Sequence, residues 1–364
     1  MSSEEFENIK DNIAYFDWNI IHYLYHPENL SPDLARKIFC LSYLLRKVII
    51  RDRWAFPFSQ AHLQDIAQGS SDLIELKLKL LDHFSRGWLI HEDFNQNFAL
   101  RMDKPTNIQD YYNWFIDANE ASNSMTEKTF ESIKPIIEQT AEYLRSQASK
   151  YPESSYTEFL FKLADSLLSE DAGLEAHRIL KEIKKQGLKD GTIRFPQVDK
   201  KVVDLQNDDL HVEINKALSK SNIPISSYEE YIAMFHPKEI DLLSEFQNQI
   251  LKLTGFADYV GLASENFKKS TAFKSMTTDQ RHLSCGLKCR FFITADKNLL
   301  QKAKFIKTWL NLDILIFDID EFVIFILKQN LRQMNIENPN PINNLTYNFC
   351  DDEGKIVHSY QIVI

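Results

Sequence analysis

Glycine is scarce in this chain, with nine glycines in 364 residues. Glycine is the usual residue where the backbone turns sharply, so a loop-rich or all-β architecture is disfavoured and helices are expected to dominate. Cysteine is also rare, and the four cysteines are too scattered for the disulfide framework of a small secreted domain. These are Cys40, Cys285, Cys289 and Cys350. A hydrophobic content of 44% still indicates a packed globular protein.

Long apolar runs are missing as well. The longest, such as residues 322–327, are far too short to span a membrane. The N-terminal sequence MSSEEFENIKDN is polar and acidic, and it lacks the apolar stretch of a signal peptide. We therefore expect a soluble protein of the reducing cytoplasm, with no membrane partner.

Positive charge is in deficit, with 42 Lys and Arg against 52 Asp and Glu, for a net charge of −10. A protein whose whole surface binds nucleic acid needs an excess of cations for the phosphates, so that class is disfavoured. A local basic face remains open, because cations outnumber acids between residues 268 and 307. They either form a solvated helix face or flank an acidic centre and hold a phosphate backbone. They are Lys268, Lys269, Lys274, Arg281, Lys288, Arg290, Lys297, Lys302, Lys304 and Lys307.

Residues 279–305 carry the most informative pattern. Apolar residues at helical spacing follow Asp279, which we expect at the start of a helix. A short apolar strand at 291–294 comes next, then Asp296, then a second helical face. A helix that enters a strand through a minimal turn is typical of a parallel α/β sheet, where ligands bind beyond the carboxyl ends of the strands. Asp279 and Asp296 could therefore face one crevice.

The N-terminal part repeats this signature. Residues 13–17 are an apolar run that ends in Asp17, with Asn19 two positions later. Residues 56–58 are a candidate strand, after which Ser59 can cap a helix that carries Asp65 about two turns in.

These stretches together resemble the PIN-domain family of metal-dependent nucleases. The matching sequences are FDWN at Asp17, SQAHLQDI at Asp65, TDQRHLSC at Asp279, and FFITADKNLL with Thr294 and Asp296. The resemblance covers roughly residues 11–95 and 240–330. Two positions depart from the family: its second acid is usually Glu, and Leu299 stands where a further acid is sometimes found.

The resemblance implies a hydrolase that cleaves phosphodiester bonds, most often in RNA, and so an endoribonuclease. Asp17, Asp65, Asp279 and Asp296 would hold one or two Mg²⁺ or Mn²⁺ ions, which resolve the repulsion of clustered carboxylates and lower the pKa of a bound water. Thr294 would orient the site through a hydrogen bond. Asn19 and His282 would either support the metal ligands through hydrogen bonds or contact the substrate.

Each of these residues also has a plainer interpretation. Asp17 can merely begin a turn, while Asp279 and Asp296 suit helix caps or first turns, and Asp65 suits a solvated helix face. His282 on a helix flank suits packing as well as a phosphate contact or proton transfer. With Cys285 and Cys289 it lies on one helix face, but a structural zinc site needs a fourth ligand, and none has a suitable spacing.

A second acidic motif follows the last apolar strand, at 312–317. Asp318 and Asp320 resemble the opening of haloacid-dehalogenase-type phosphatases, but the segment that follows is too short for that domain. Capping of the next helix is the favoured interpretation. No P-loop and no glycine-rich dinucleotide motif occurs.

We therefore predict an α/β fold with a PIN-like parallel sheet flanked by helices. The expected parts are a first PIN-like segment at 1–95, a large helical insertion at 96–240, a second PIN-like segment at 241–330 and a C-terminal tail at 331–364. The tail predicts a β-hairpin around a loop at 351–355, which needs a sheet edge or a second chain for stability. The rival function is a catalytically inactive PIN-like scaffold that binds a protein partner or a second copy through the insertion or the hairpin.

Overall fold

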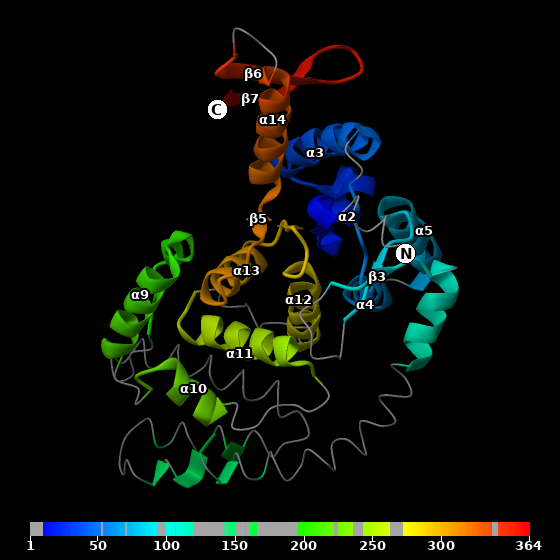
Figure 1. The fold of residues 1–364 in the computed structure, drawn as a ribbon. Coiled ribbons are helices and arrows are strands. Elements are labelled where there is room, and N and C mark those ends of the chain that lie inside the picture. The colour runs from blue at the N-terminus through cyan, green and yellow to red at the C-terminus, as the bar shows by residue number, and fades with distance from the viewer. Residues whose placement is uncertain are drawn as a thin grey trace.

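The computed structural model describes most of the chain outside the middle. The described residues are 10–51, 54–69, 71–92, 100–105, 107–118, 196–221, 225–235, 243–262, 272–336 and 341–364, with scattered positions between 138 and 165. Figure 1 shows the described elements, with the C-terminal hairpin at one end and helices α9 to α11 at the other.

A three-stranded parallel sheet joins the two ends of the sequence. Its order is β1 (Ala14–Phe16), β4 (Phe291–Ile293) and β5 (Leu315–Phe317). Tyr15 pairs with Phe292, which in turn pairs with Ile316. The predicted parallel α/β core, with a long stretch of chain between its first and second strands, is confirmed.

Beyond β1 the sheet continues only as isolated bridges. Ile13 pairs with Ala55 and Phe58 with Leu89, both in parallel. The prediction of a strand at 56–58 is therefore wrong in detail: only Phe58 makes a bridge, and its partner begins β2 (Leu89–Ile90), which pairs with β3 (Met102–Asp103). These edge contacts still bring the helix after Ser59 beside β1.

Helices cover both faces of the sheet (Figure 1). Alternate strand side chains point to opposite faces. Tyr15 and Phe292 join one buried cluster with Phe256 and Leu283, while Phe16 joins the other. The sheet is thus buried on both sides, which explains why its strands are continuous apolar runs. The helices are α2 (Trp18–Tyr25), α3 (Pro32–Arg51), α4 (Gln60–Gln68), α5 (Ile74–Ser85), α9 (Asn207–Ser219), α10 (Tyr228–Phe235), α11 (Glu245–Tyr259), α12 (Ala272–Gly286), α13 (Lys297–Trp309) and α14 (Ile319–Asn335).

Short 3-10 helices complete the described elements. They are η1 (Lys10–Asn12), η2 (Pro27–Asn29), η3 (Ser71–Leu73) and η4 (Lys200–Asp204).

Helix α12 lies close against the sheet because of Gly286. A Cβ at this position would stand 2.6 Å from the ring of Phe292 and 3.1 Å from the ring of Tyr15. Any side chain here would push the helix away from β1 and β4, so glycine sets the distance between α12 and the sheet.

One helix start differs from the sequence prediction. Asp279 does not start its helix, since α12 begins at Ala272 and Asp279 lies about two turns in. Thr278, just before it, is buried, and its Oγ1 accepts a hydrogen bond from Gln68 at 3.2 Å.

The sequence of residues 228–255 has a helical pattern, with Pro237 expected in a turn or at a helix start, and the structure has two helices there. Helix α10 ends at Phe235, and α11 starts behind a capping box at Ser244.

The predicted C-terminal hairpin is confirmed, with β6 (Asn344–Cys350) and β7 (Ile356–Val363) joined by residues 351–355. It finds support within the chain, because Phe349 and Ile362 are buried in the cluster that includes α14 and α3. The hydroxyl of Tyr360 donates to Asp320 at 2.6 Å. The hairpin therefore packs on helices of its own chain.

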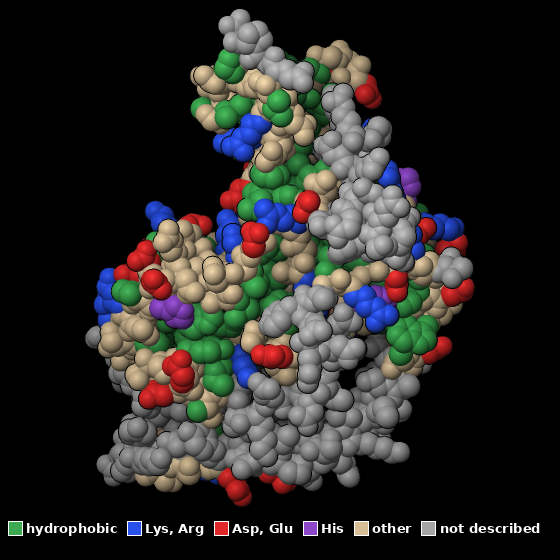
Figure 2. All heavy atoms as spheres, viewed as in Figure 1, with side chains coloured by type: hydrophobic (Ala, Val, Ile, Leu, Met, Phe, Trp, Pro, Cys, Tyr) green, Lys and Arg blue, Asp and Glu red, His purple; other side chains and the backbone are tan. Residues whose placement is uncertain are grey.

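The helical insertion at 96–240 stays a prediction, because most of it lies outside the described residues. Apolar spacing in the sequence predicts helices at 107–121, 125–149, 156–167, 170–186 and 209–220. The first is present as helix at 108–118 and the last as α9, whereas the other three fall largely outside the described residues. None of the described helices has the length and apolarity needed to cross a membrane. On the face drawn in Figure 2, acidic and basic side chains are interspersed, and neither sign forms a continuous patch.

Candidate functional site

Asp17 and Thr294 meet where the two central strands end. Asp17 directly follows β1 and is 1% exposed, while Thr294 directly follows β4 and is fully buried. The hydroxyl of Thr294 donates a short hydrogen bond to Oδ2 of Asp17, and Oδ1 accepts from the backbone of Ile20 at 3.1 Å. Parallel pairing makes this contact, because both strands end at one edge of the sheet.

Asp296 belongs to the same group. Its backbone N–H donates to Oγ1 of Thr294 at 3.0 Å, so Thr294 links the two aspartates. The Asp296 carboxylate is exposed, and one oxygen accepts from the N–H groups of Asn298 and Leu299 at 2.7 and 2.9 Å. Asp17 and Asp296 are thus the N-caps of α2 and α13, and the plainer interpretation predicted this cap for Asp296.

Capping alone does not explain the burial of Asp17. Burial raises the pKa of its carboxyl to about 6, and the negative charge of Asp296 adds to the rise. The hydrogen bond from Thr294, the positive charge of His282 and the bond from Ile20 only partly offset this. A surface cap would have avoided that cost, so Asp17 is an ionisable group held in an unfavourable environment, as functional carboxylates often are.

Asp65 and His282 form a second pair across α4 and α12. Nε2 of His282 donates to Oδ2 of Asp65 at 2.8 Å, and the imidazole is 2% exposed. Burial disfavours the charged ring, but the hydrogen bond and charge of Asp65, together with the charges of Asp17 and Asp279, raise the pKa of His282 overall. The charges of Asp65, Asp17 and Asp279 thus all favour the protonated form of this ring.

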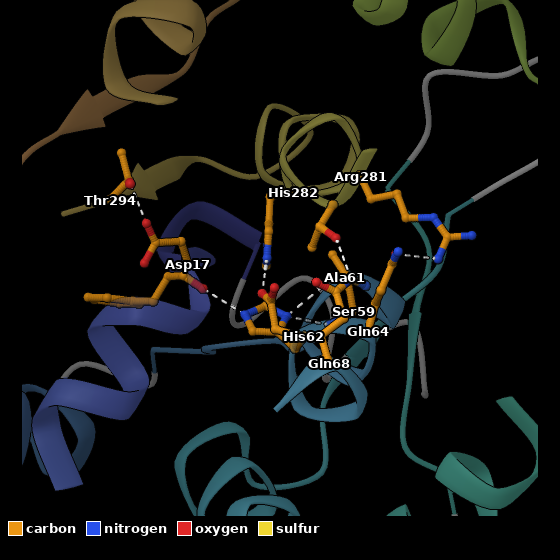
Figure 3. A network of polar contacts seen from close by, with 12 residues as sticks. Asp17, Ser59, Ala61, His62, Gln64, Gln68, Arg281, His282 and Thr294 are labelled. Carbon is orange, nitrogen blue, oxygen red and sulfur yellow. Dashed lines mark hydrogen bonds and ion pairs between the residues drawn. The ribbon is translucent and has the colours of Figure 1, made fainter. Parts of the chain in front are cut away.

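Figure 3 shows His282 and His62 close to each other, with Asp17 and Thr294 beside them. A buried polar chain continues from His282 into the core. Its Nδ1 lies 2.7 Å from the hydroxyl of Tyr15, which lies 2.7 Å from Oγ of Ser59. The second histidine, His62, accepts from the backbone of Ser59 at Nδ1 and therefore donates from Nε2 to the carbonyl of Phe16 at 2.8 Å.

The two histidines have different electrical roles. Burial and the neighbouring His282 lower the pKa of His62 well below its usual value, so this ring stays neutral. Their rings meet edge to face at 4.9 Å between centroids. His62 is a structural residue that completes the capping box of α4 with Ser59 and ties that helix to β1. The chain from Ser59 to Asp65 fixes the position of α12 relative to α4.

The remaining predicted residues lie nearby with weaker contacts. Asp279 is partly exposed on α12, one turn before His282, whose pKa its charge helps to raise. Asn19 is exposed in the first turn of α2. Asp65, Asp17 and Asp279 therefore act on His282 through their charges, while Thr294 links Asp17 to Asp296.

Among the described residues, no three His, Cys, Asp or Glu side chains are arranged as a ready-made metal site. The carboxylates are instead engaged by Thr294, by His282 and by the N-terminus of α13. Each carboxylate oxygen can accept more than one bond. Mg²⁺ takes oxygen ligands and usually keeps several waters, with only one or two carboxylates from the protein. The donor set of Asp17 and Asp296 fits such a hydrated ion.

Ion pairs neutralise part of the basic segment among the described residues. Four of its cations make ion pairs: Arg281 with Glu92, Arg290 with Asp313, Lys302 with Asp258 and Lys304 with Glu321. Lys302 is buried, so the expectation of a solvated face is wrong for that residue. These pairs also reduce the number of cations free to hold phosphates.

The residues behind the zinc and phosphatase alternatives have structural contacts in the fold. Cys285 and Cys289 are buried in the core, and Cys289 lies in the turn after α12 rather than on its face. Asp318 caps α14 through a capping box with Glu321. Asp320 receives hydrogen bonds from Lys37 at 2.7 Å and from Tyr360.

Three further residues belong to the site, although the sequence predicts no role in it for them. Tyr15 lies in the expected first strand, and His62 lies in the expected helix after Ser59. The spacing of Ser59 and His62, with His at the third helical position, is a capping-box pattern that could have pointed to the histidine. Glu92 gave no local signal, yet it is 6% exposed, and burial raises its pKa although Arg281 opposes the rise.

Comparisons of the chain with protein-family models, with curated protein sequences and with solved structures found no match.

Proposed function

We propose that this protein is a nuclease of the PIN-like type that hydrolyses phosphodiester bonds in RNA, with Mg²⁺ or Mn²⁺ as cofactor. One observation carries the proposal: Asp17 follows β1 and Asp296 lies shortly after the paired strand β4, and both aspartates are hydrogen-bonded to Thr294. Ligand sites in parallel α/β sheets lie beyond this edge.

Charge supports a cation at this place. Asp17 is buried with a raised pKa, and the exposed carboxylate of Asp296 adds negative charge beside it. A divalent ion would remove the cost of ionising Asp17. Bound there, such an ion would lower the pKa of a water and neutralise charge on a phosphate.

The residues around the carboxylates have distinct tasks in this proposal. Thr294 holds Oδ2 of Asp17 and the backbone of Asp296, which fixes their relative position. His282 holds Asp65 through Nε2 and connects through Nδ1 to Tyr15. It is therefore a positioning residue for the α4 carboxylate, and Asp279 lies one turn away on the solvent side. Asp65 and Asp279 are the ligands we assign to the outer part of the site or to a second ion.

The rival proposal is a non-catalytic scaffold. The net charge of −10 and the ion pairing of the basic segment favour it, because both weaken general attraction to nucleic acid. The buried Asp17 with its raised pKa opposes it, since capping of α2 alone does not require a buried carboxylate.

Cleavage of labelled single-stranded RNA by the full chain, with Mn²⁺ or with EDTA, separates the two. We expect cleavage that needs the ion and that falls on the order of 10²- to 10³-fold in Asp17→Asn and Asp296→Asn, the range for loss of a group that stabilises the transition state. Asparagine caps helices as well as aspartate, so the fold is retained.

Asp318→Asn is the matched control. Asp318 also follows a parallel strand and caps the next helix, but it contacts neither Thr294 nor Asp17 in the bonds of the described structure. Its variant should cleave like the native protein. Ion-dependent cleavage that survives in both Asp17→Asn and Asp296→Asn would contradict the proposal, and so would the absence of cleavage by the native protein on single-stranded RNA and DNA alike.

A further inference from the structure

The outer edge of β6 is open in the C-terminal hairpin. In the described structure β6 pairs only with β7, and β7 lies against α14 and α3 (Figure 1). The N–H of Ile364 donates to the carbonyl of Asn343 at 3.1 Å, which sets the alternation of the ladder. Every second residue of β6 therefore directs its backbone N–H and C=O away from β7. These residues are Asn344, Thr346 and Asn348, and all three are exposed.

The side chain of Asn335 shows that this edge accepts a neighbour. Its amide nitrogen donates to the carbonyl of Ile342 at 2.8 Å, and its oxygen accepts from the N–H of Ile342 at 3.0 Å. An adjacent strand makes the same two bonds to a strand edge. Asn335 thus occupies the edge just before β6, and a bulge at 349–350 interrupts it at the other end. The stretch left for a partner is 344–348.

The sequence of the two strands does not protect this edge. Proteins usually blunt an exposed edge with charged side chains or proline, because an open edge pairs with other chains. Residues 344–350 and 356–363 contain no Asp, Glu, Lys, Arg or Pro. Exposed apolar side chains that gather in one place usually mark an interaction site. Those in or beside the hairpin are Met334, Ile336, Ile342, Ile356, Val363 and Ile364, with exposed fractions from 37% to 77%.

The two ends of β6 carry opposite charges. Asp352 and Glu353 lie in the turn after β6, and both are exposed. Arg332 is exposed one turn before Asn335, whose side chain is bonded to Ile342 just before β6. In an antiparallel pair of identical strands, the end of each strand lies beside the start of the other. The acidic turn of one copy would thus meet the basic end of α14 in a second copy.

Charge also narrows the choice of partner. The chain has a net charge of −10, so two copies approach each other best at a surface that bears no net charge. A nucleic acid is disfavoured at this edge, because the two strands offer no Lys or Arg to its phosphates. A second copy satisfies both conditions, since it brings the same uncharged edge and the complementary ends.

We propose that the protein forms a dimer in which β6 pairs antiparallel with β6 of a second copy. The two-fold axis passes beside Thr346, so Asn344 of each copy lies opposite Asn348 of the other. Hydroxyl and amide side chains both donate and accept hydrogen bonds, so this pairing of like with like has no conflict. The result is a four-stranded sheet in which every contact occurs twice. The inference does not depend on the proposed function.

The mass of the full chain over a range of concentrations tests the dimer, by light scattering after size exclusion. We expect a dimer that Thr346→Lys weakens at least about tenfold, because the substitution places two ammonium groups opposite each other at the axis. Gln361→Lys is the matched control. Gln361 is exposed and pairs with Thr346 within the hairpin, but it lies on β7. This variant should dimerise like the native protein, and circular dichroism shows whether both variants keep their fold.

Cross-linking tests the register, and it does not depend on the folding of the lysine variant. Directly opposite Cα atoms at hydrogen-bonded positions are about 5.5 Å apart, which a disulfide can span. Thr346→Cys, in a Cys350→Ser background, should therefore form a covalent dimer under mild oxidation. Gln361→Cys in the same background should stay monomeric on a non-reducing gel. The other three cysteines are buried.

Charge reversal tests the two ends of the strand. Arg332→Glu should weaken the dimer about tenfold, because two symmetry-related ion pairs are replaced by repulsion. Adding Glu353→Arg to this variant should recover most of the loss.

Three results would overturn the inference. The first is a native chain that stays monomeric at every concentration, which would leave the nuclease standing if that monomer cleaves RNA. The second is a dimer that survives Thr346→Lys, or one that cross-links through Gln361→Cys but not through Thr346→Cys, because either places the second copy on another surface. The third is an equal loss of the dimer in both lysine variants, since the edge of β6 would then have no special part in it.

Discussion

Two groups of acids follow parallel strands in this protein, and they differ in how their charge is balanced. At the ends of β1 and β4, Asp17 and Asp296 lie close together, and burial raises the pKa of Asp17 to about 6. At the end of β5, Asp320 is also partly buried, but its hydrogen bonds from Lys37 and Tyr360 lower its pKa.

The difference shows which group is structural. Asp320 has the partners that a buried carboxylate needs, and these partners attach α3 and the hairpin to α14. Asp17 has a hydroxyl, a backbone N–H and only the more distant charge of His282. Poorly compensated carboxylates gather at functional sites, so Asp17 is the group that we propose as a cation ligand.

The largest expected effect concerns activity. Asp17→Asn should reduce ion-dependent RNA cleavage by at least about 10²-fold, whereas Asp320→Asn should leave it within about threefold. Initial rates at saturating Mn²⁺ check this contrast. Equal losses in the two variants would mean that the comparison of the two acidic groups is mistaken.

The same substitution, Asp17→Asn, should raise the stability of the protein although it lowers the activity. Its pKa rises on folding from 3.8 to about 6, so the folded state binds more protons between these pH values and stability falls as pH rises through them. Above pH 6 the penalty is on the order of 3 kcal/mol. Asp17→Asn should therefore be more stable than the native protein at pH 7.5 and equal to it at pH 4, as measured by urea unfolding in EDTA.

Cations should remove part of that penalty. Mg²⁺ or Mn²⁺ binds the ionised carboxylates, so it should raise the melting temperature more at pH 8 than at pH 5, where Asp17 is mostly protonated. At a hundredfold excess over the dissociation constant the gain is about 2.7 kcal/mol. Thermal scans with and without Mn²⁺ test this, and Asp320→Asn serves as the control that keeps the response. A gain that is as large in Asp17→Asn as in the native protein would place the ion elsewhere.

The smallest effect concerns the hairpin. Tyr360→Phe removes the hydroxyl that donates to Asp320 at 2.6 Å, which should cost about 1.5–3 kcal/mol, the usual value for a hydrogen bond to a charged group. Urea unfolding measures the loss. Cleavage should stay unchanged, because Tyr360 serves the structural acid. A variant that keeps its stability but loses activity would reverse the roles assigned to the two groups.

Some of this could be predicted from local patterns. Short apolar runs followed by an acid indicate β1, β4 and β5. Ser59 and Asp318 indicate helix starts. The predicted helix start at Asp279 is wrong because tertiary contacts replaced a local signal. Thr278, the residue before it, is buried against Gln68 inside α12.

The charge balance of the site could not be predicted in this way. Lys302 belongs to a basic run, yet it is buried against Asp258 of another helix. Tyr15 and His282 are far apart in sequence but 2.7 Å apart in space. No periodicity encodes such contacts, because they depend on how α12 packs on the sheet.

The sequence by itself determined the class of fold, the strand ends and the identity of the acids that follow them, because period and composition act locally. Only the tertiary structure decided which acids lie close together and which are neutralised by a partner. Parallel pairing of β1 with β4 brings Asp17 to Thr294, while the packing of α3 and the hairpin on α14 gives Asp320 its partners. Electrostatic free energy depends on distance and burial, and both are properties of the folded chain.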